Sequence, residues 1–586
     1  MNPAMNRRDL IRGAALTGGG LTLSAWMPAW AQSVSAGIAK PLPTVSGNDI
    51  SLKIAHQMMM VDGRQSHAIG INGTVPGPLI RLRQGQTARL SVINDLEEDS
   101  SIHWHGLLVP FQFDGVPGVS FPGIKPKSTF VYEFPIVQAG TYWYHSHSGL
   151  QEQMGLYGPI VIDPAGDDPI QSDREHVIVL SDHSSMHPHA IFRKLKQVGG
   201  GYFNYQRQTL AGLLGKQDQP LKDRLEWGNM RMDPTDVSDV TGSTYTYLVN
   251  GHGPRDNWTA LFRPGERVRL RVVNASAMTT FNVRIPGLKL TVVQADGLNV
   301  RPVEVDEFQI AVAETYDVIV TPTDDRAYTL VGESVDRSGM ARATLAPREG
   351  MVAEVPALRK RPIATMKDMG MGDMHGVMPG MDHAAMGHDM SGAAAGGMAM
   401  GTMNMRDASK APQVKMGPGV QTISPMPMDR TGEPGQGLDD VGHRVLVYRD
   451  LMAVERNPDL RAPDRAMEIH LTGNMERYMW SFDGVKLSDK REPIPFVENE
   501  RVRVTLINET MMSHPIHLHG HFFELVTGHG EYSPRKHTVN VAPGGKVSFD
   551  VTADAVGDWA FHCHMLYHMH AGMMRVVSVR PRGEAA

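Results

Sequence analysis

His562-Cys563-His564, followed by His568 and Met573, surrounds the single cysteine in a chain of 586 residues. Two imidazoles, one thiolate and a long axial methionine are the ligands of a blue-copper electron-transfer site. Successive side chains of a strand face opposite ways, so Cys563 is predicted to point to one side and its two neighbours to the other. One short strand can therefore contact two metal centres. A buried free cysteine is the alternative for Cys563 taken alone.

Three further histidine clusters repeat this spacing: His103-Trp104-His105, His145-Ser146-His147 and His514-Pro515-Ile516-His517-Leu518-His519. Each i,i+2 pair in a strand presents two imidazoles on one face, roughly 6.6 Å apart. His514 lies an odd number of residues from His517, so it is predicted to face the other way and to join Cys563, His568 and Met573. The remaining histidines are predicted to share one centre: His103, His105, His145, His147, His517, His519, His562 and His564.

These motifs resemble those of the multicopper oxidases, which read H-x-H, H-x-H, H-x-x-H-x-H and H-C-H-x-x-x-H-x-x-x-x-M in that order. The resemblance implies a type 1 copper held by His514, Cys563 and His568, with Met573 axial. It also implies a type 2 copper held by His103 and His517. A type 3 copper pair would take the other six, which are His105, His145, His147, His519, His562 and His564. Asp233-Pro234-Thr235-Asp236 and Tyr567-His568-Met569 are similar to the copper-resistance branch, the CopA and PcoA proteins of bacteria.

Short strands punctuated by Gly, Pro and Asn make up most of the remaining sequence. Residues 89–94, 267–274 and 501–508 carry the same element three times, alternating apolar residues that run into an asparagine. Such repetition implies duplicated domains, and the strand content implies β-sandwiches with Greek-key connections. We expect an all-β fold of three cupredoxin domains, at residues 45–165, 170–345 and 435–582. The middle domain lacks a histidine pair after Asn274 and is predicted to hold no copper.

Two segments break this pattern. Residues 184–240 contain helix-like stretches and form a predicted insertion in the second domain, with a possible role in covering the domain interface. Residues 366–405, within a linker at 350–434, are rich in methionine among Gly, Ala, Asp and His. A core helix would not tolerate so many glycines, and thioether sulfur is a soft ligand for Cu(I). We therefore predict additional Cu(I) binding there, the alternative being a flexible tether.

The N-terminus is typical of an export signal. Arg7-Arg8 precedes a mildly apolar, glycine-rich stretch, and Ala29-Trp30-Ala31 offers a cleavage site, so residues 1–31 are predicted to be a twin-arginine signal for the periplasm. A net charge of −6 gives no basic surface for nucleic acid, and one cysteine excludes intramolecular disulfides. We expect a monomer with no membrane anchor and no nucleic-acid partner.

The resemblance implies an oxidase that takes single electrons at the type 1 copper and reduces O₂ to water at the trinuclear cluster. The backbone of Cys563 would pass electrons to His562 and His564. Asp114 matches the family acid that assists proton delivery, although an aspartate before Gly115 also favours a turn. Met569 stands where some members carry a carboxylate, so the second proton donor is not identified.

Three functions are consistent with the sequence. A periplasmic cuprous oxidase serving copper resistance is supported by the Met-rich segment and by methionines near the type 1 ligands, at Met511, Met512, Met569 and Met574. A laccase-like oxidase of phenols would use the same four coppers. A copper-sequestering binding protein would use the ligands without turnover. A two-domain nitrite reductase is set aside because it does not need the type 3 ligands.

Overall fold

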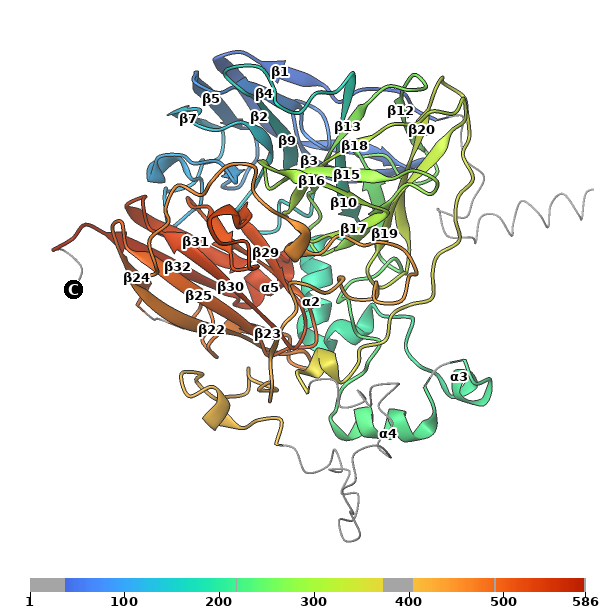
Figure 1. Cartoon of the computed structure of the whole chain (residues 1–586), viewed down its shortest axis with the longest axis vertical. Coiled ribbons are helices and arrows are strands. Elements are labelled where there is room, and N and C mark those ends of the chain that lie inside the picture. The colour runs from blue at the N-terminus through green and yellow to red at the C-terminus, as the bar shows by residue number, and fades with distance from the viewer. Residues whose placement is uncertain (1–36, 218, 372–403, 490–491, 584–586) are drawn as a thin grey trace, which may run out of the picture.

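The computed structural model describes residues 37–217, 219–371, 404–489 and 492–583. Three β-sandwiches follow one another along the chain, coloured blue, green and red in Figure 1. The all-β prediction is confirmed. The predicted signal at 1–31 lies outside the described residues. No helix within the described ranges has the length and apolar character needed to cross a membrane.

The first sandwich packs a sheet of order β3-β2-β5-β7 against one of order β1-β4-β9-β8-β6. Its strands are β1 (Thr44–Ser46), β2 (Asp49–Val61), β3 (Arg64–Ile71), β4 (Leu79–Arg83), β5 (Thr87–Asn94), β6 (His103–His105), β7 (Ser128–Pro135), β8 (Gly140–His145) and β9 (Tyr157–Asp163).

The second sandwich has sheets of order β11-β10-β13-β18-β15-β16 and β12-β20-β19-β14-β17. Its strands are β10 (Arg174–His183), β11 (Thr246–Val249), β12 (Trp258–Leu261), β13 (Val268–Asn274), β14 (Phe281–Arg284), β15 (Leu290–Ala295), β16 (Leu298–Val305), β17 (Glu307–Ile310), β18 (Thr315–Val320), β19 (Tyr328–Ser334) and β20 (Met340–Ala346).

The third sandwich has sheets of order β23-β22-β25-β30-β27-β28 and β24-β32-β31-β26-β29, and β21 (Met428–Asp429) adds to β30. Its strands are β22 (Arg465–Asn474), β23 (Met479–Phe482), β24 (Ile494–Val497), β25 (Arg501–Asn508), β26 (His514–Leu518), β27 (Phe523–Leu525), β28 (Arg535–Lys536), β29 (Thr538–Val541), β30 (Gly545–Thr552), β31 (Gly557–Cys563) and β32 (Met574–Arg580). A short helix, α5 (Leu566–Ala571), joins the last two strands.

The element that repeats in the sequence is the same strand in each sandwich: β5, β13 and β25. Each runs parallel to one neighbour and antiparallel to another. The asparagine that ends each strand accepts a hydrogen bond from the backbone N–H two residues later. Its side-chain amide also donates to a facing backbone carbonyl, at Ile124, Ile310 and Val541 respectively. The asparagine thus satisfies buried backbone groups where the strand stops, which explains why it recurs.

Two strand pairs bring the histidine motifs opposite one another. In the first sandwich, β6 pairs with β8 so that His103 faces His145 in register. In the third sandwich, β26 pairs with β31 so that His517 faces His562. The two pairs meet where the first and third sandwiches adjoin, because the His564 ring lies within 5 Å of the His105 and His145 rings, at 4.9 Å and 4.8 Å between centroids.

Buried polar contacts join the second sandwich to the other two. Arg271 Nη1 lies 3.0 Å from Thr141 Oγ1 of the first sandwich. Lys536 Nζ of the third sandwich lies 3.0 Å from Asp296 and 3.2 Å from Glu314 of the second. All five side chains are buried. Because an unpaired buried charge is costly, these contacts favour one relative placement of the sandwiches.

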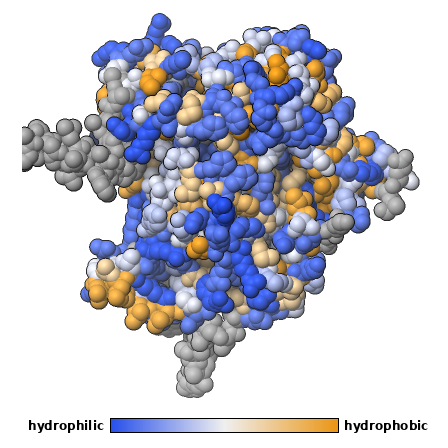
Figure 2. Space-filling model, turned by 180° about the vertical axis from the view of Figure 1, so that it is seen from behind, coloured by the Kyte–Doolittle hydropathy of each residue, from blue (hydrophilic) through white to orange (hydrophobic). Residues whose placement is uncertain are grey.

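The insertion at 184–240 is partly helical, as predicted, with α2 (Pro188–Val198), α3 (Leu210–Leu214) and α4 (Leu221–Asn229). Helix α2 packs on the third sandwich, where the Phe192 ring stacks on Tyr567 and Lys196 Nζ donates to the Tyr478 carbonyl. The insertion therefore covers α5. Exposed leucines on α3 and α4 form an apolar patch, at lower left in Figure 2.

Candidate metal centre

Cys563 and two histidines converge at one buried point in the third sandwich. The thiol Sγ lies 3.6 Å from His514 Nδ1 and 3.9 Å from His568 Nδ1. The two Nδ1 atoms are 3.2 Å apart. Met573 is fully buried beside them, and its carbonyl accepts the Cys563 N–H at 3.1 Å. The structure thus brings His514 and His568 together with Cys563, the three residues that the resemblance assigns to one mononuclear site.

Each imidazole is held by a hydrogen-bond partner at Nε2, the ring nitrogen that faces away from Cys563. His514 Nε2 lies 2.8 Å from Thr510 Oγ1, whose own hydrogen is directed to Asn508 Oδ1. His568 Nε2 lies 2.6 Å from Asp239 Oδ2, and its ring stacks on Trp480 at 3.9 Å between centroids. These partners favour the tautomer of each ring that carries the proton on Nε2 and presents the Nδ1 lone pair to the thiol. Such outer contacts fix the tautomer of metal-binding histidines.

Asp239 reaches this site from the insertion in the second sandwich. Tyr478 Oη donates to the same carboxylate oxygen at 2.8 Å. Burial raises the pKa of Asp239 to about 7. A cation held at His568 Nδ1 would favour the charged carboxylate.

If the copper that the resemblance implies binds here, Asp239→Asn is expected to weaken its binding by about 10- to 100-fold, because the anionic partner of His568 is lost. The measurement is bleaching of the blue band by a competing chelator. Tyr478→Phe is the matched control, since it removes one hydrogen bond but keeps the carboxylate, and it should change the affinity little. Equal copper affinities for wild type and Asp239→Asn would show that the Asp239 carboxylate does not contribute to copper binding.

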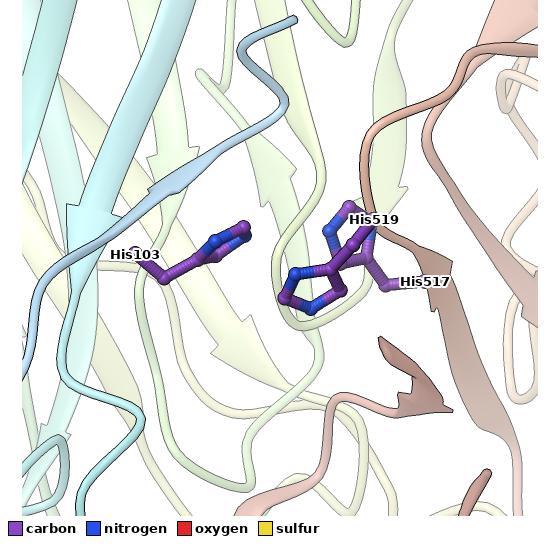
Figure 3. Close-up of side chains that lie close together, drawn as sticks. All are labelled: His103, His517 and His519. Atoms are coloured by element: carbon purple, nitrogen blue, oxygen red, sulfur yellow. The ribbon is translucent and has the colours of Figure 1, made fainter. Parts of the chain in front are cut away.

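The eight remaining histidines meet between the first and third sandwiches. Figure 3 shows His103 of the first sandwich directed toward His517 and His519 of the third. Ring centroids lie 4.0 Å apart for His103 and His519, and 3.9 Å for His105 and His517. Nε2 atoms face each other at 3.0 Å for His519 and His562, and at 3.3 Å for His145 and His564. Ligand nitrogens bound to one ion at about 2 Å lie about 3 Å apart, so these separations fit shared ions.

Backbone carbonyls and two carboxylates hold the outer edges of these rings. His103 Nδ1 donates to the Asp114 carbonyl at 2.7 Å, and His519 Nδ1 donates to Asp114 Oδ2 at 2.9 Å. His145 Nδ1 lies 2.7 Å from Glu152 Oε2. Asp114 and Glu152 are both buried. Burial and the nearby Asp182 hold the pKa of Glu152 well above its usual range.

Gly115 allows Asp114 to approach the rings this closely. Its φ is +84°, and a Cβ at this position would lie 1.9 Å from the Ile102 carbonyl, directly before His103. The turn expected at Asp114-Gly115 is therefore present, and the same turn presents the carboxylate to two imidazoles.

Several buried ring nitrogens of the cluster have no hydrogen-bond partner, and the Nε2 atoms among them are free to bind a metal. They are Nε2 of His103, His147 and His517, and Nδ1 of His105 and His564. Burial holds the pKa well below the ordinary histidine value for His105, His145, His147, His514, His517, His519 and His564. It lowers the pKa of His562 to about 4 and that of His568 to about 3. Neutral imidazoles with free lone pairs fit copper ions without competition from protons.

Comparison with known proteins agrees with this geometry. Family models described as multicopper oxidase match residues 53–167, 219–350 and 461–583. Together these ranges cover more than half of the sequence. This chain belongs to the multicopper oxidase family. Family membership implies copper as the cofactor, and the imidazole and thiolate set described above fits it.

Two relatives match this multicopper oxidase over nearly its whole length. Copper resistance protein A of Escherichia coli is 47% identical over 98% of this chain and 99% of its own length. Copper resistance protein A of Pseudomonas syringae pv. tomato is 46% identical over 99% of this chain and 100% of its own length.

Solved structures share the fold. A laccase from Botrytis aclada superimposes with a TM-score of 0.61 at 20% identity, covering 92% of this chain and 88% of the laccase. A multicopper oxidase from Pseudomonas thermotolerans gives a TM-score of 0.57 at 21% identity, covering 92% of this chain and all of that protein. The three-domain cupredoxin-like architecture of the oxidase is therefore established.

Four residues at the centre lie outside the sequence prediction: Thr510, Asp239, Glu152 and His537. His537 lies beside His105 and His517, with its Nε2 also lacking a partner. Glu152 follows His147 by five positions and could have been found by a search for acids near the motif. Asp239 is separated from His568 by 329 positions and carries no local signal.

Proposed function

We propose that this protein is a periplasmic cuprous oxidase with four resident copper ions, in which the electrons of Cu(I) reduce O₂ to water in support of copper resistance. The burial of the Cys563 site behind a methionine cluster is the observation that carries the choice of Cu(I) as substrate. The name of the two relatives that match nearly the whole chain supports the role in copper resistance.

His514, Cys563 and His568, with Met573 axial, would hold the type 1 copper. His103 and His517 would hold the type 2 copper, and the other six predicted histidines the type 3 pair. When bound, copper would supply one-electron chemistry at Cys563 and the reduction of O₂ at the eight-histidine cluster. Backbone bonds from Cys563 to His562 and His564 connect the two sites covalently.

Protons for water formation come from solvent, and side chains of the protein must relay them to the buried histidine cluster. Asp114 is the proposed donor, because its carboxylate touches the rings of His103 and His519 and its Oδ1 has no hydrogen-bond partner. Glu152 contacts His145 from another side of the cluster. It is our candidate for the second acid, in place of the carboxylate that Met569 replaces.

A bulky phenol would have no direct access to the imidazoles of the Cys563 site. His514 and His568 are fully buried, as are Trp480 and Tyr567 around them. Both Nε2 edges already have protein partners. An organic substrate that must touch the imidazole edge is therefore disfavoured.

A methionine cluster lies next to this site. It packs around Trp227 and comprises Met230, Met232, Met366, Met369, Met371, Met405, Met475 and Met511. Met511 precedes the proposed ligand His514 by three positions. Residues 372–403 of the Met-rich segment lie outside the described residues, but its ends contribute to the cluster. Thioether sulfur prefers Cu(I), so the cluster is suited to the proposed substrate.

A cavity of about 380 Å³ opens on this cluster. Met232, Met475 and Met511 line it, together with Asp233 and Asp236. Burial, with repulsion from Asp239 and Asp233, raises the pKa of Asp236 to about 8. Asp236 lines the cavity and is repelled by Asp239, which in turn contacts the proposed type 1 ligand His568. We propose that Cu(I) donates its electron from this cavity.

Met232→Leu/Met511→Leu is expected to lower kcat/KM for Cu(I) by about tenfold or more, because two soft ligands are lost. Leucine conserves volume, so the fold should be kept. The measurement is anaerobic Cu(I) delivery followed by O₂ consumption, with a small phenol as parallel substrate. Met154→Leu, a partly buried methionine of the first sandwich, is the matched control.

The two alternative functions predict different results in this experiment. A phenol oxidase would show unchanged Cu(I) and phenol rates in the double variant. A copper-sequestering protein would retain Cu(I) in wild type without consuming O₂. We further propose the domain limits 45–165, 170–345 and 435–582, a monomeric state, and export directed by the twin-arginine pattern at residues 1–31.

A further inference from the structure

A second group of metal-binding side chains lies on the outer face of the first sandwich. Strands β2 and β3 form an antiparallel hairpin, and β3 is the edge strand of its sheet. The exposed positions of this hairpin include His56, Met58, Met60, Gln65 and His67. Exposed edge strands are usually protected by charged side chains. Besides Arg64, this hairpin exposes two imidazoles and two thioethers.

Three of these side chains form a compact triangle. The ring centroids of His56 and His67 are 4.9 Å apart, across the two strands. Met58 is the register partner of His67, and Cβ atoms of directly opposed residues lie about 5 Å apart. Met58 also shares a strand face with His56, two positions earlier. Two nitrogens and one sulfur can therefore reach one point above the hairpin.

A second imidazole pair lies near the hairpin. His187 and His189, at the start of the insertion helix α2, stack with centroids 5.4 Å apart. Partial burial, with repulsion first from His189 and then from His67, lowers the pKa of His187. Imidazoles from two separate elements gather on this part of the surface.

We propose that His56, Met58 and His67 form a surface Cu(I) site, separate from the four resident coppers and from the methionine cluster. Thioether sulfur selects Cu(I) and imidazole also binds it, so this donor set suits that ion. The 54% exposure of Met58 leaves the bound ion accessible to solvent and to a donor molecule. The pairing of β2 with β3 fixes the backbone positions of all three residues.

The test is anaerobic competition for Cu(I) between the fully reduced holoenzyme and the chromophoric chelator bicinchoninate. His56→Ala/His67→Ala should retain one Cu(I) fewer per chain than wild type. Met58→Leu keeps the shape but loses the sulfur, and should weaken the same site by about tenfold or more. Gln65→Ala, on the same exposed face, is the matched control and should retain as much Cu(I) as wild type.

Equal Cu(I) retention in wild type and in the double histidine variant would overturn the site. An equal loss in Gln65→Ala would also overturn it, by showing that the loss comes from the hairpin as a whole. The blue band and the phenol rate should be unchanged in all variants, which verifies the holoenzyme. Because no turnover occurs without O₂, the result does not depend on whether Cu(I) is the substrate.

Discussion

Cys563→Ser is expected to abolish turnover and to remove the intense visible band of copper–thiolate bonding. The serine hydroxyl is a poor replacement for a soft anionic ligand. Cys563 is fully buried between His514 and His568, so no other sulfur in that triad can take its place. Absorption spectra and O₂ consumption of the purified variant are the measurements. Copper analysis should show the loss of one ion of the proposed four.

Met573→Leu is the control for this change, because it removes the proposed axial ligand and keeps the thiolate. Its visible band should persist. The eight-histidine cluster should be filled in both variants, since its ligands come from other strand faces. A blue Cys563→Ser protein would contradict the assignment of the mononuclear site.

Asp114→Asn is expected to lower kcat by about 10²-fold or more, within the range for a positioned acid–base group. Asparagine keeps the size of the side chain and the turn preference at Gly115, but it cannot accept and release a proton. The carboxylate contacts the rings of His103 and His519 and makes no contact with the Cys563 triad. The visible band and the copper content should therefore survive.

Stopped-flow absorption measures reduction of the blue site and its reoxidation by O₂ as separate steps. The blue band of Asp114→Asn should bleach at the wild-type rate under a reductant and return slowly when O₂ is added. Asp95→Asn, at a half-buried aspartate of the same sandwich that pairs with surface lysines, should behave as wild type. Recovery of the band at the wild-type rate in Asp114→Asn would leave Asp114 as a turn residue.

Strand geometry explains why much of the centre could be predicted from the sequence. Alternation along β31 separates Cys563 from His562, and the same rule separates His514 from His517 on β26. The repeated asparagine likewise marks one strand in each sandwich, because its hydrogen bonds are local. These features depend on residues close together in the chain.

Contacts between distant segments could not be predicted in this way. Asp239 reaches His568 only because the insertion folds over the third sandwich. The Met-rich composition predicts soft ligands at 366–405, but it does not reveal that Met230, Met475 and Met511 pack with the ends of that segment. These positions depend on how separate layers dock, which local pattern does not determine.

The division of the histidine cluster between the first and third sandwiches also constrains biogenesis. His145 and His564 face each other across 419 positions of sequence. During synthesis, the histidines of the first sandwich therefore leave the ribosome long before those of the third sandwich are made. Contacts of such high sequence separation form late in folding. A chain that has not completed its last strand pair therefore lacks the ligands with which the third sandwich completes this histidine cluster.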